Sequence, residues 1–191
     1  LHDDAVCACA RHADRHVGVP RCARGGRGAL RAGVATFGKV NDMLRFIDLF
    51  AGLGGIRMGL ELACRNRGIR AQCVFSSEIK PAAREALRHN HPHEEVWGDI
   101  TQIDAEAIPD FDVLLAGFPC QAFSVAGKRL GFEDTRGTLF FEVERILRAK
   151  RPQGFILENV EGLVTHDREK RSDKMGRTLR IILEHLASAG Y

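Results

Sequence analysis

The sequence predicts an α/β protein with an open, mostly parallel, doubly wound (Rossmann-like) sheet. Three observations predict it: short apolar runs alternate with stretches of helical periodicity, glycines follow the first run, and acidic residues follow several others. In sheets of this kind, ligands bind at the carboxyl ends of the strands. We therefore expect the chemistry of this protein at one edge of its sheet.

The first unit is predicted as a strand over 45–50, a glycine-rich turn over 51–55 and a helix that starts at Ile56 and closes at Gly68. Glycines let the backbone approach a ligand closely, and a helix N-terminus favours a carboxylate or a phosphate. By itself this opening is a weak signal, because many α/β proteins use such glycines only to turn.

The second strand is expected over 72–77 and ends in Glu78, where folds of this type commonly hold ribose hydroxyls. Pro81 then begins a helix that runs to about Asn90. A third short strand is expected over 96–100, with an acid near its end. A turn around the helix end is predicted to be solvated and not to bind a metal, although it contains three histidines: His89, His91 and His93.

The fourth strand is the apolar run Val113–Ala116, which reads as buried on both faces. It must stop before Pro119, which lacks a backbone donor. A lone cysteine, Cys120, follows at the carboxyl end of this strand. Most free cysteines are small buried hydrophobes, but a thiol in a loop at this edge is a candidate nucleophile.

The remaining elements are a helix over 138–149, a strand over 154–157 that ends in Glu158, a solvated charge run over 167–174, and a last helix that is marked by apolar residues from Leu179 onward and ends near Gly190. Since Glu158 has apolar neighbours in sequence, we expect it to be shielded from water, which favours its protonated form. Because acids and glycines gather at the strand ends, we interpret Cys120 as a nucleophile and not as a buried core cysteine.

Charge and composition divide the 191 residues into two parts. Residues 1–42 hold seven Lys or Arg and four Asp or Glu, and residues 43–191 hold 21 of each, so the net charge of +3 lies in the first part. We expect 1–42 to be a disordered leader or an upstream translation, with the natural start at Met43. Bulk charge gives no support for nucleic-acid binding by 43–191.

Cysteine spacing and hydropathy indicate where in the cell the protein is found. Six irregularly spaced cysteines indicate reduced thiols, and no apolar run reaches transmembrane length, so we expect an intracellular protein without a membrane partner. A zinc site in residues 1–42 is an alternative, with the ligands Cys7, Cys9, His12, His16 and Cys22. Their spacing matches no common structural zinc site, so we expect no metal.

A thiolate and a carboxyl group on neighbouring strand ends suit addition to an electron-poor ring carbon, in which the acid hydrogen-bonds a ring nitrogen. At these residues the sequence resembles the DNA (cytosine-5) methyltransferases, particularly the bacterial modification enzymes of restriction systems. The resemblance covers 43–191 and is carried by five motifs in the family's order: 48–55, 98–100, 117–124, 136–140 and 158–160.

The resemblance implies S-adenosyl-L-methionine as cofactor and double-stranded DNA with a flipped cytosine as partner, since a stacked base cannot be reached. Cys120 would attack carbon 6, Glu158 would engage ring nitrogen 3, and carbon 5 would take the methyl group. The implied cofactor contacts are Phe50, Gly52, Leu53, Gly55, Glu78, Ile79, Asp99, Ile100, Pro119 and Leu139. The implied DNA contacts are Gln121, Ser124, Lys128 and Arg136.

Within these contacts, the resemblance assigns Phe50 and Ile79 to the adenine ring, Glu78 to the ribose and Asp99 to the adenine amino group. Two neighbouring positions depart from the family: Lys80 stands where an acid is more usual, and Ile79 where an aromatic ring is frequent. The family's later arginine-rich motif, recognition region and final asparagine-containing motif are not in these residues. We therefore expect an amino-terminal part of an enzyme that is monomeric at full length, located in the bacterial cytoplasm or on the nucleoid.

Three alternatives stay open. The chain could be a non-catalytic remnant that binds the cofactor weakly or pairs with a complementary chain, or a tRNA cytosine methyltransferase that shares this domain. The Gly117-Phe118-Pro119-Cys120 form favours DNA over tRNA, by resemblance only. A nicotinamide dehydrogenase would explain the glycine turn but not the cysteine paired with Glu158. The recognition sequence cannot be predicted, because no residue that reads base edges is identified.

Overall fold

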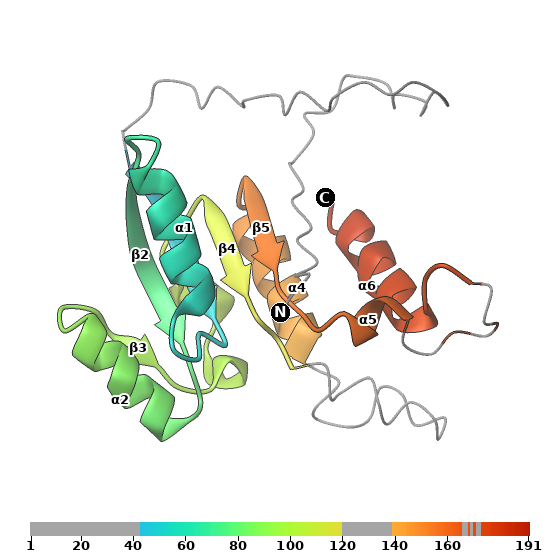
Figure 1. Cartoon of the computed structure of the whole chain (residues 1–191), viewed down its shortest axis with the longest axis horizontal. Coiled ribbons are helices and arrows are strands. Elements are labelled where there is room, and N and C mark those ends of the chain that lie inside the picture. The colour runs from blue at the N-terminus through green and yellow to red at the C-terminus, as the bar shows by residue number, and fades with distance from the viewer. Residues whose placement is uncertain (1–42, 120–138, 166–167, 169, 171–172) are drawn as a thin grey trace.

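All five predicted strands form, and they lie parallel in the order β3-β2-β1-β4-β5 (Figure 1). The computed structural model describes residues 43–119, 139–165, 168, 170 and 173–191. The strands are β1 (Met43–Leu49), β2 (Arg70–Ser77), β3 (Val96–Trp97), β4 (Val113–Ala116) and β5 (Gly154–Leu157). The parallel α/β sheet that the alternating pattern predicts is confirmed.

Helices α1, α2 and α4 connect successive strands, whereas α5 and α6 follow the last strand (Figure 1). They are α1 (Gly55–Arg65), α2 (Pro81–Asn90), α4 (Leu139–Lys150), α5 (Gly162–Thr165) and α6 (Arg177–Ser188), with 3-10 turns η1 (Ile100–Gln102) and η2 (Ala105–Ala107). No helix within the described ranges is both long and apolar enough to cross a membrane.

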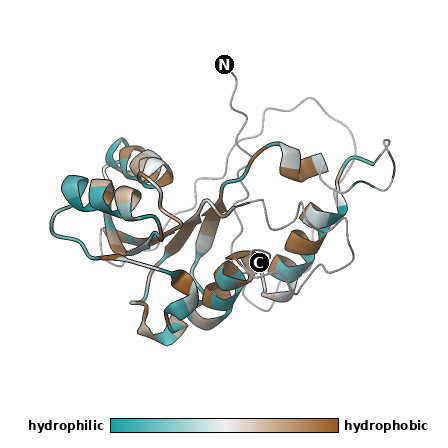
Figure 2. Cartoon of the chain, turned by 90° about the horizontal axis from the view of Figure 1, so that it is seen from below, coloured by the Kyte–Doolittle hydropathy of each residue, from teal (hydrophilic) through white to brown (hydrophobic). Residues whose placement is uncertain are grey.

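One face of the sheet packs against α4 and α6, and its core contains strand residues such as Ile47, Leu114 and Phe155. The other face packs Phe46 and Leu115 against the apolar side of α1. Figure 2 shows the result as apolar strands in the middle and more polar helices outside. Because both faces are covered, the strands can be almost wholly apolar, as the sequence pattern indicated.

The strands end together. In the pairing register Leu49 lies opposite both Ser77 and Ala116, Ser77 lies opposite Trp97, and Ala116 lies opposite Leu157. Each of these is the last residue of its strand. The segments that follow all five strands therefore start at one level, along the carboxyl edge of the sheet.

Several predicted boundaries are wrong: β1 begins at Met43 and not at 45, β2 begins at Arg70 and not at 72, and α1 ends at Arg65, before Gly68. The third strand ends at Trp97 and not at 100, because the Asp99 side chain accepts a hydrogen bond from the Thr101 N–H (3.0 Å) and turns the chain into η1. Phe50 lies outside β1 in a left-handed conformation (φ 55°). The turns η1 and η2 and the short helix α5 were not predicted. Parts of the charge run 167–174 lie outside the described residues.

Candidate active site

The carboxyl edge of the sheet brings together residues from four strand ends: Phe50 after β1, Glu78 after β2, Gly117 after β4 and Glu158 after β5. Eleven predicted site residues lie in the described part of the chain. Five lie outside it: Cys120, Gln121, Ser124, Lys128 and Arg136. The leader 1–42, with its zinc alternative, also lies outside. Among the described residues, no three His, Cys, Asp or Glu side chains gather as a metal site would require.

Glu78 joins the glycine turn to the second strand. Its side chain is buried, and its two carboxylate oxygens accept hydrogen bonds from the Gly52 N–H (2.8 Å) and the Lys80 N–H (2.8 Å). The Gly52 backbone is left-handed (φ 54°), a conformation that glycine adopts without strain. Each carboxylate oxygen can accept a second bond, so Glu78 keeps capacity for ligand hydroxyls.

Three large, exposed apolar residues are linked to this acid by chain position or by a backbone hydrogen bond. Leu53, which follows Gly52, is 68% exposed, and Ile79, which follows Glu78, is 64% exposed. Trp97, whose carbonyl accepts the Glu78 N–H (3.0 Å), is half exposed and stacks on Phe75 at 5.9 Å. A buried acid among exposed apolar surfaces suits a ligand with a flat ring and hydroxyls. Sequence reasoning missed Trp97, although its place directly before the Gly98-Asp99 motif was a signal.

The remaining predicted cofactor contacts differ in accessibility. Phe50 and Leu139 are half-buried, Gly55 is the exposed first residue of α1, and Pro119 is exposed. The Ile100 side chain is buried in the core beneath α4.

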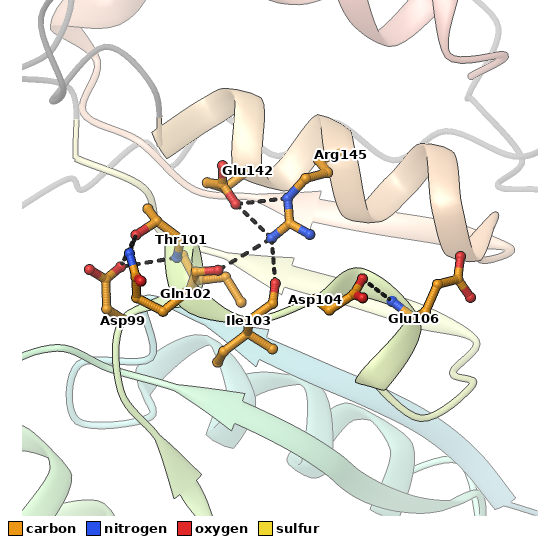
Figure 3. A network of polar contacts seen from close by, with 9 residues as sticks. Asp99, Thr101, Gln102, Ile103, Asp104, Glu106, Glu142 and Arg145 are labelled. Atoms are coloured by element: carbon orange, nitrogen blue, oxygen red, sulfur yellow. Dashed lines mark hydrogen bonds and ion pairs between the residues drawn. The ribbon is translucent and has the colours of Figure 1, made fainter.

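The loop that carries Asp99 and Ile100 is fixed to α4 by Arg145 (Figure 3). The Arg145 guanidinium donates to the carbonyl oxygens of Ile100 (3.2 Å) and Ile103 (2.9 Å) and is held by Glu142 (2.6 Å). The Asp99 carboxylate accepts from the N–H and the hydroxyl of Thr101. Arg145 was missed in the sequence, where only its spacing from Glu142 on a helix could have indicated it.

The ends of β4 and β5 are tied to each other. The Glu158 N–H donates to the Ala116 carbonyl (2.9 Å), and the Asn159 amide donates to the Phe118 carbonyl (2.8 Å). A Cβ atom on Gly117 would lie 3.2 Å from Oε2 of Glu158, so the carboxylate rests against the backbone three residues before Cys120. The expected shielding of Glu158 is wrong: its side chain is exposed, because it follows the last strand residue and no described helix covers it.

Asp48 is a buried acid that sequence reasoning placed only within a motif. Its side chain is 2% exposed, and its Oδ2 atom has no hydrogen-bond partner among the described residues. Burial raises the pKa of Asp48 to about 7, and the nearby Arg57 limits this rise. Arg57 is itself buried, donates to Glu61 (2.8 Å) and Glu94 (2.7 Å), and lies over the Phe46 ring.

The five-stranded parallel sheet with helices packed on both faces defines an α/β protein of the doubly wound, Rossmann-like class. Within that class, the chain belongs to the C-5 cytosine-specific DNA methylase family, whose sequence profile matches residues 44–191. The family resemblance of the motifs is thereby confirmed.

Its relatives include two type II methyltransferases, M.NgoBV of Neisseria gonorrhoeae and M.NlaIV of Neisseria lactamica. Each is 67% identical over 150 residues, which is 78% of this chain but 36% of the relative. The chain thus spans about a third of the length of these relatives.

Solved structures share the fold. The Entamoeba histolytica methyltransferase EhMeth superposes with a TM-score of 0.60 at 20% identity, over 76% of this chain and 44% of that one. The Dnmt2 methyltransferase of S. pombe gives 0.55 at 25% identity, over 76% of this chain and 41% of that one.

Proposed function

We propose that this chain is the amino-terminal catalytic part of a DNA (cytosine-5) methyltransferase of a bacterial restriction–modification system. The substrate would be double-stranded DNA with one cytosine flipped out of the stack. The observation that carries the proposal is the contact between the Glu158 carboxylate and Gly117, which joins the acid to the strand end that leads into Cys120. The names of the type II relatives support the reaction and the biological system.

Cys120 and Glu158 would carry the chemistry. The Cys120 thiolate forms a bond to carbon 6 of the ring while Glu158 donates a proton to ring nitrogen 3, so the electron pair of the ring double bond moves toward carbon 5. Once carbon 5 carries the methyl group, its proton would pass to solvent water, the bond between Cys120 and carbon 6 would break to re-form the ring double bond and the thiolate, and ring nitrogen 3 would return its proton to Glu158.

The residues around Glu78 fit the cofactor S-adenosyl-L-methionine. When bound, it supplies the electrophilic methyl group that carbon 5 accepts. Glu78 would accept from the ribose hydroxyls, and Phe50 and Ile79 would contact the adenine ring. The buried carboxylate beside the exposed Leu53 and Ile79 supports this assignment.

The DNA contacts, oligomeric state and cell compartment are part of the same proposal. The DNA would be contacted by Gln121, Ser124, Lys128 and Arg136, with Lys128 and its neighbour Arg129 on phosphates. The full-length protein would act as a monomer in the bacterial cytoplasm or on the nucleoid, where its substrate is.

The test is methyl transfer by the full-length gene product. Incubation with S-adenosylmethionine labelled in its methyl group and double-stranded DNA should label 5-methylcytosine after digestion to nucleosides. Cys120→Ser should abolish the transfer, and Cys64→Ala, which changes a buried cysteine in α1, should retain it. Transfer that survives Cys120→Ser, label in tRNA instead of DNA, or no transfer at all would each overturn the proposal.

A further inference from the structure

The Asn159 side chain makes a contact that the proposed reaction does not use. Its amide nitrogen donates to the carbonyl of Phe118 (2.8 Å), and its amide oxygen accepts from the Val160 N–H (3.0 Å). The first bond crosses from the end of β5 to the end of β4, and the second keeps the side chain in the turn after β5. Asn159 therefore links two strand ends that carry different parts of the reaction.

Phe118 is held at both of its ends. Its ring is buried in the main core and packs on the Phe140 ring of α4 at 5.7 Å. Its carbonyl is held by Asn159. With the Glu158 N–H bound to Ala116, the chain from Ala116 to Phe118 is fixed relative to the turn after β5.

The held carbonyl belongs to the peptide group between Phe118 and Pro119, which is trans. The proline ring locks the next backbone dihedral, φ, near −65°. Only the ψ angle of Pro119 then rotates before the peptide group of Cys120. Holding the Phe118 carbonyl thus restricts the orientation of Pro119, the residue directly before the proposed nucleophile.

We propose that Asn159 is a positioning residue: its amide fixes the Phe118–Pro119 peptide group, and so holds the residue that precedes Cys120 at a set position relative to the turn that carries Glu158. The inference rests on the proposed function. Asn159 touches neither the cofactor residues around Glu78 nor their loops among the contacts described, so its effect should fall on the chemical step and not on cofactor binding.

The variants separate the hydrogen bond from size and charge. Asn159→Asp keeps the shape and the acceptor toward Val160 but removes the donor, whereas Asn159→Ala removes the side chain without adding charge. Asn66 follows the C-terminal end of α1, at the opposite edge of the sheet. Asn66→Asp and Asn66→Ala are therefore matched controls.

In the full-length gene product, both Asn159 variants should lower kcat for methyl transfer on the order of 10- to 100-fold, because a small misplacement of reacting groups costs that much. The KM for S-adenosylmethionine should stay within about twofold of wild type, and the Asn66 variants should match wild type in both. A wild-type kcat in either Asn159 variant, or a rise in KM that accounts for the loss, would overturn the inference.

Hydrogen exchange tests the hydrogen bond between the Asn159 amide and the Phe118 carbonyl without relying on activity. Amides over 114–118 should exchange faster in both Asn159 variants than in wild type, with no change in the Asn66 variants. Unchanged exchange would show that Asn159 does not hold this strand end. If exchange rises in the Asn159 variants but the wild-type protein transfers no methyl group, Asn159 does hold the end of β4 and the proposed function is wrong.

Discussion

Folding moves the Asp48 carboxyl group out of water, and burial raises its pKa from 3.8 to about 7. Between these pH values the folded protein holds a proton that the unfolded chain has released. The stability from this proton is fully present below pH 3.8 and is lost as the pH rises through about 7. Arg57 on α1 counteracts the shift, while Glu61 on α1 and Glu78 after β2 add to it.

Asp48→Asn should therefore gain stability over wild type as the pH rises, because an amide has no proton to lose. We expect its advantage in the free energy of unfolding to grow by about 3 kcal/mol from pH 5 to pH 8. Urea unfolding of the 191-residue chain at both pH values measures this. Asp110→Asn, at an exposed acid, is the control and should show no such growth. A difference for Asp48→Asn that is the same at both pH values would contradict the burial argument.

A side chain at position 117 would crowd two neighbouring side chains. A Cβ atom would lie 3.2 Å from Oε2 of Glu158 and 3.4 Å from Cδ1 of Ile56. Because the exposed Glu158 side chain can swing away, Gly117→Ala should leave the melting temperature nearly unchanged while lowering methyl transfer on the order of tenfold or more.

Gly59→Ala is the matched control, since nothing lies within 4 Å of its Cβ position in α1. It should keep full activity and gain up to about 1 kcal/mol of stability from helix propensity. Methyl transfer at the wild-type rate in Gly117→Ala would show that the position of the Glu158 carboxylate does not matter.

Among the elements, α4 fixes the loop after β3 through Arg145, whose guanidinium binds two carbonyls of that loop. Arg145→Met should loosen the loop and weaken S-adenosylmethionine binding by the full-length gene product about tenfold, as measured by calorimetry. Arg148→Met on the same helix removes contacts to Glu144 and Ser188 instead, so its affinity should match wild type. Equal affinity in both variants would mean that the Asp99 loop does not contribute to the cofactor site.

Element types were predictable because both faces of the sheet impose strong patterns. The runs that form β4 and β5 are apolar throughout, and α4 shows its stripe at helical spacing. The short turns were not predictable from periodicity, because side chains such as Asp99 and Asp104 create them through single hydrogen bonds to nearby N–H groups.

At the scale of the whole molecule, the charge is unevenly divided. Residues 43–191 carry no net charge, so the 191-residue chain should bind random double-stranded DNA mainly through the excess of three positive charges in 1–42. Removing 1–42 should weaken this binding and reduce the slope of log K against log salt by about 3. Fluorescence anisotropy across a salt series measures both.

A chain of unchanged length with Arg11, Arg15 and Arg21 replaced by glutamine controls for the loss of residues. It should behave like the deletion. A deletion that leaves the salt dependence unaltered would place the cationic contacts in 43–191 instead.

The edge of the sheet could be predicted because strand ends in a parallel sheet must meet, which placed Glu78 and Glu158 there. The contacts across the edge could not be. The Asn159 amide and Phe118 carbonyl are 41 residues apart, and Arg145 reaches Ile100 across 45. The predicted shielding of Glu158 is wrong because neighbouring residues on a strand point to opposite faces of the sheet. Glu158 lies just past the last residue of β5, so neither covered face of the sheet buries its side chain.

The strand order also bears on the order in which the two halves of the carboxyl edge can fold: the half formed by β1, β2 and β3, and the half formed by β4 and β5. On the β1-β2-β3 side, the bonded residues Gly52 and Glu78 are 26 residues apart in the chain. On the other side, β1 pairs with β4, where Phe46 lies opposite Val113, so a longer loop must close. Loop-closure entropy delays the longer pairing. On the ribosome, the nucleoside half would thus be complete before the half that bears Glu158 exists.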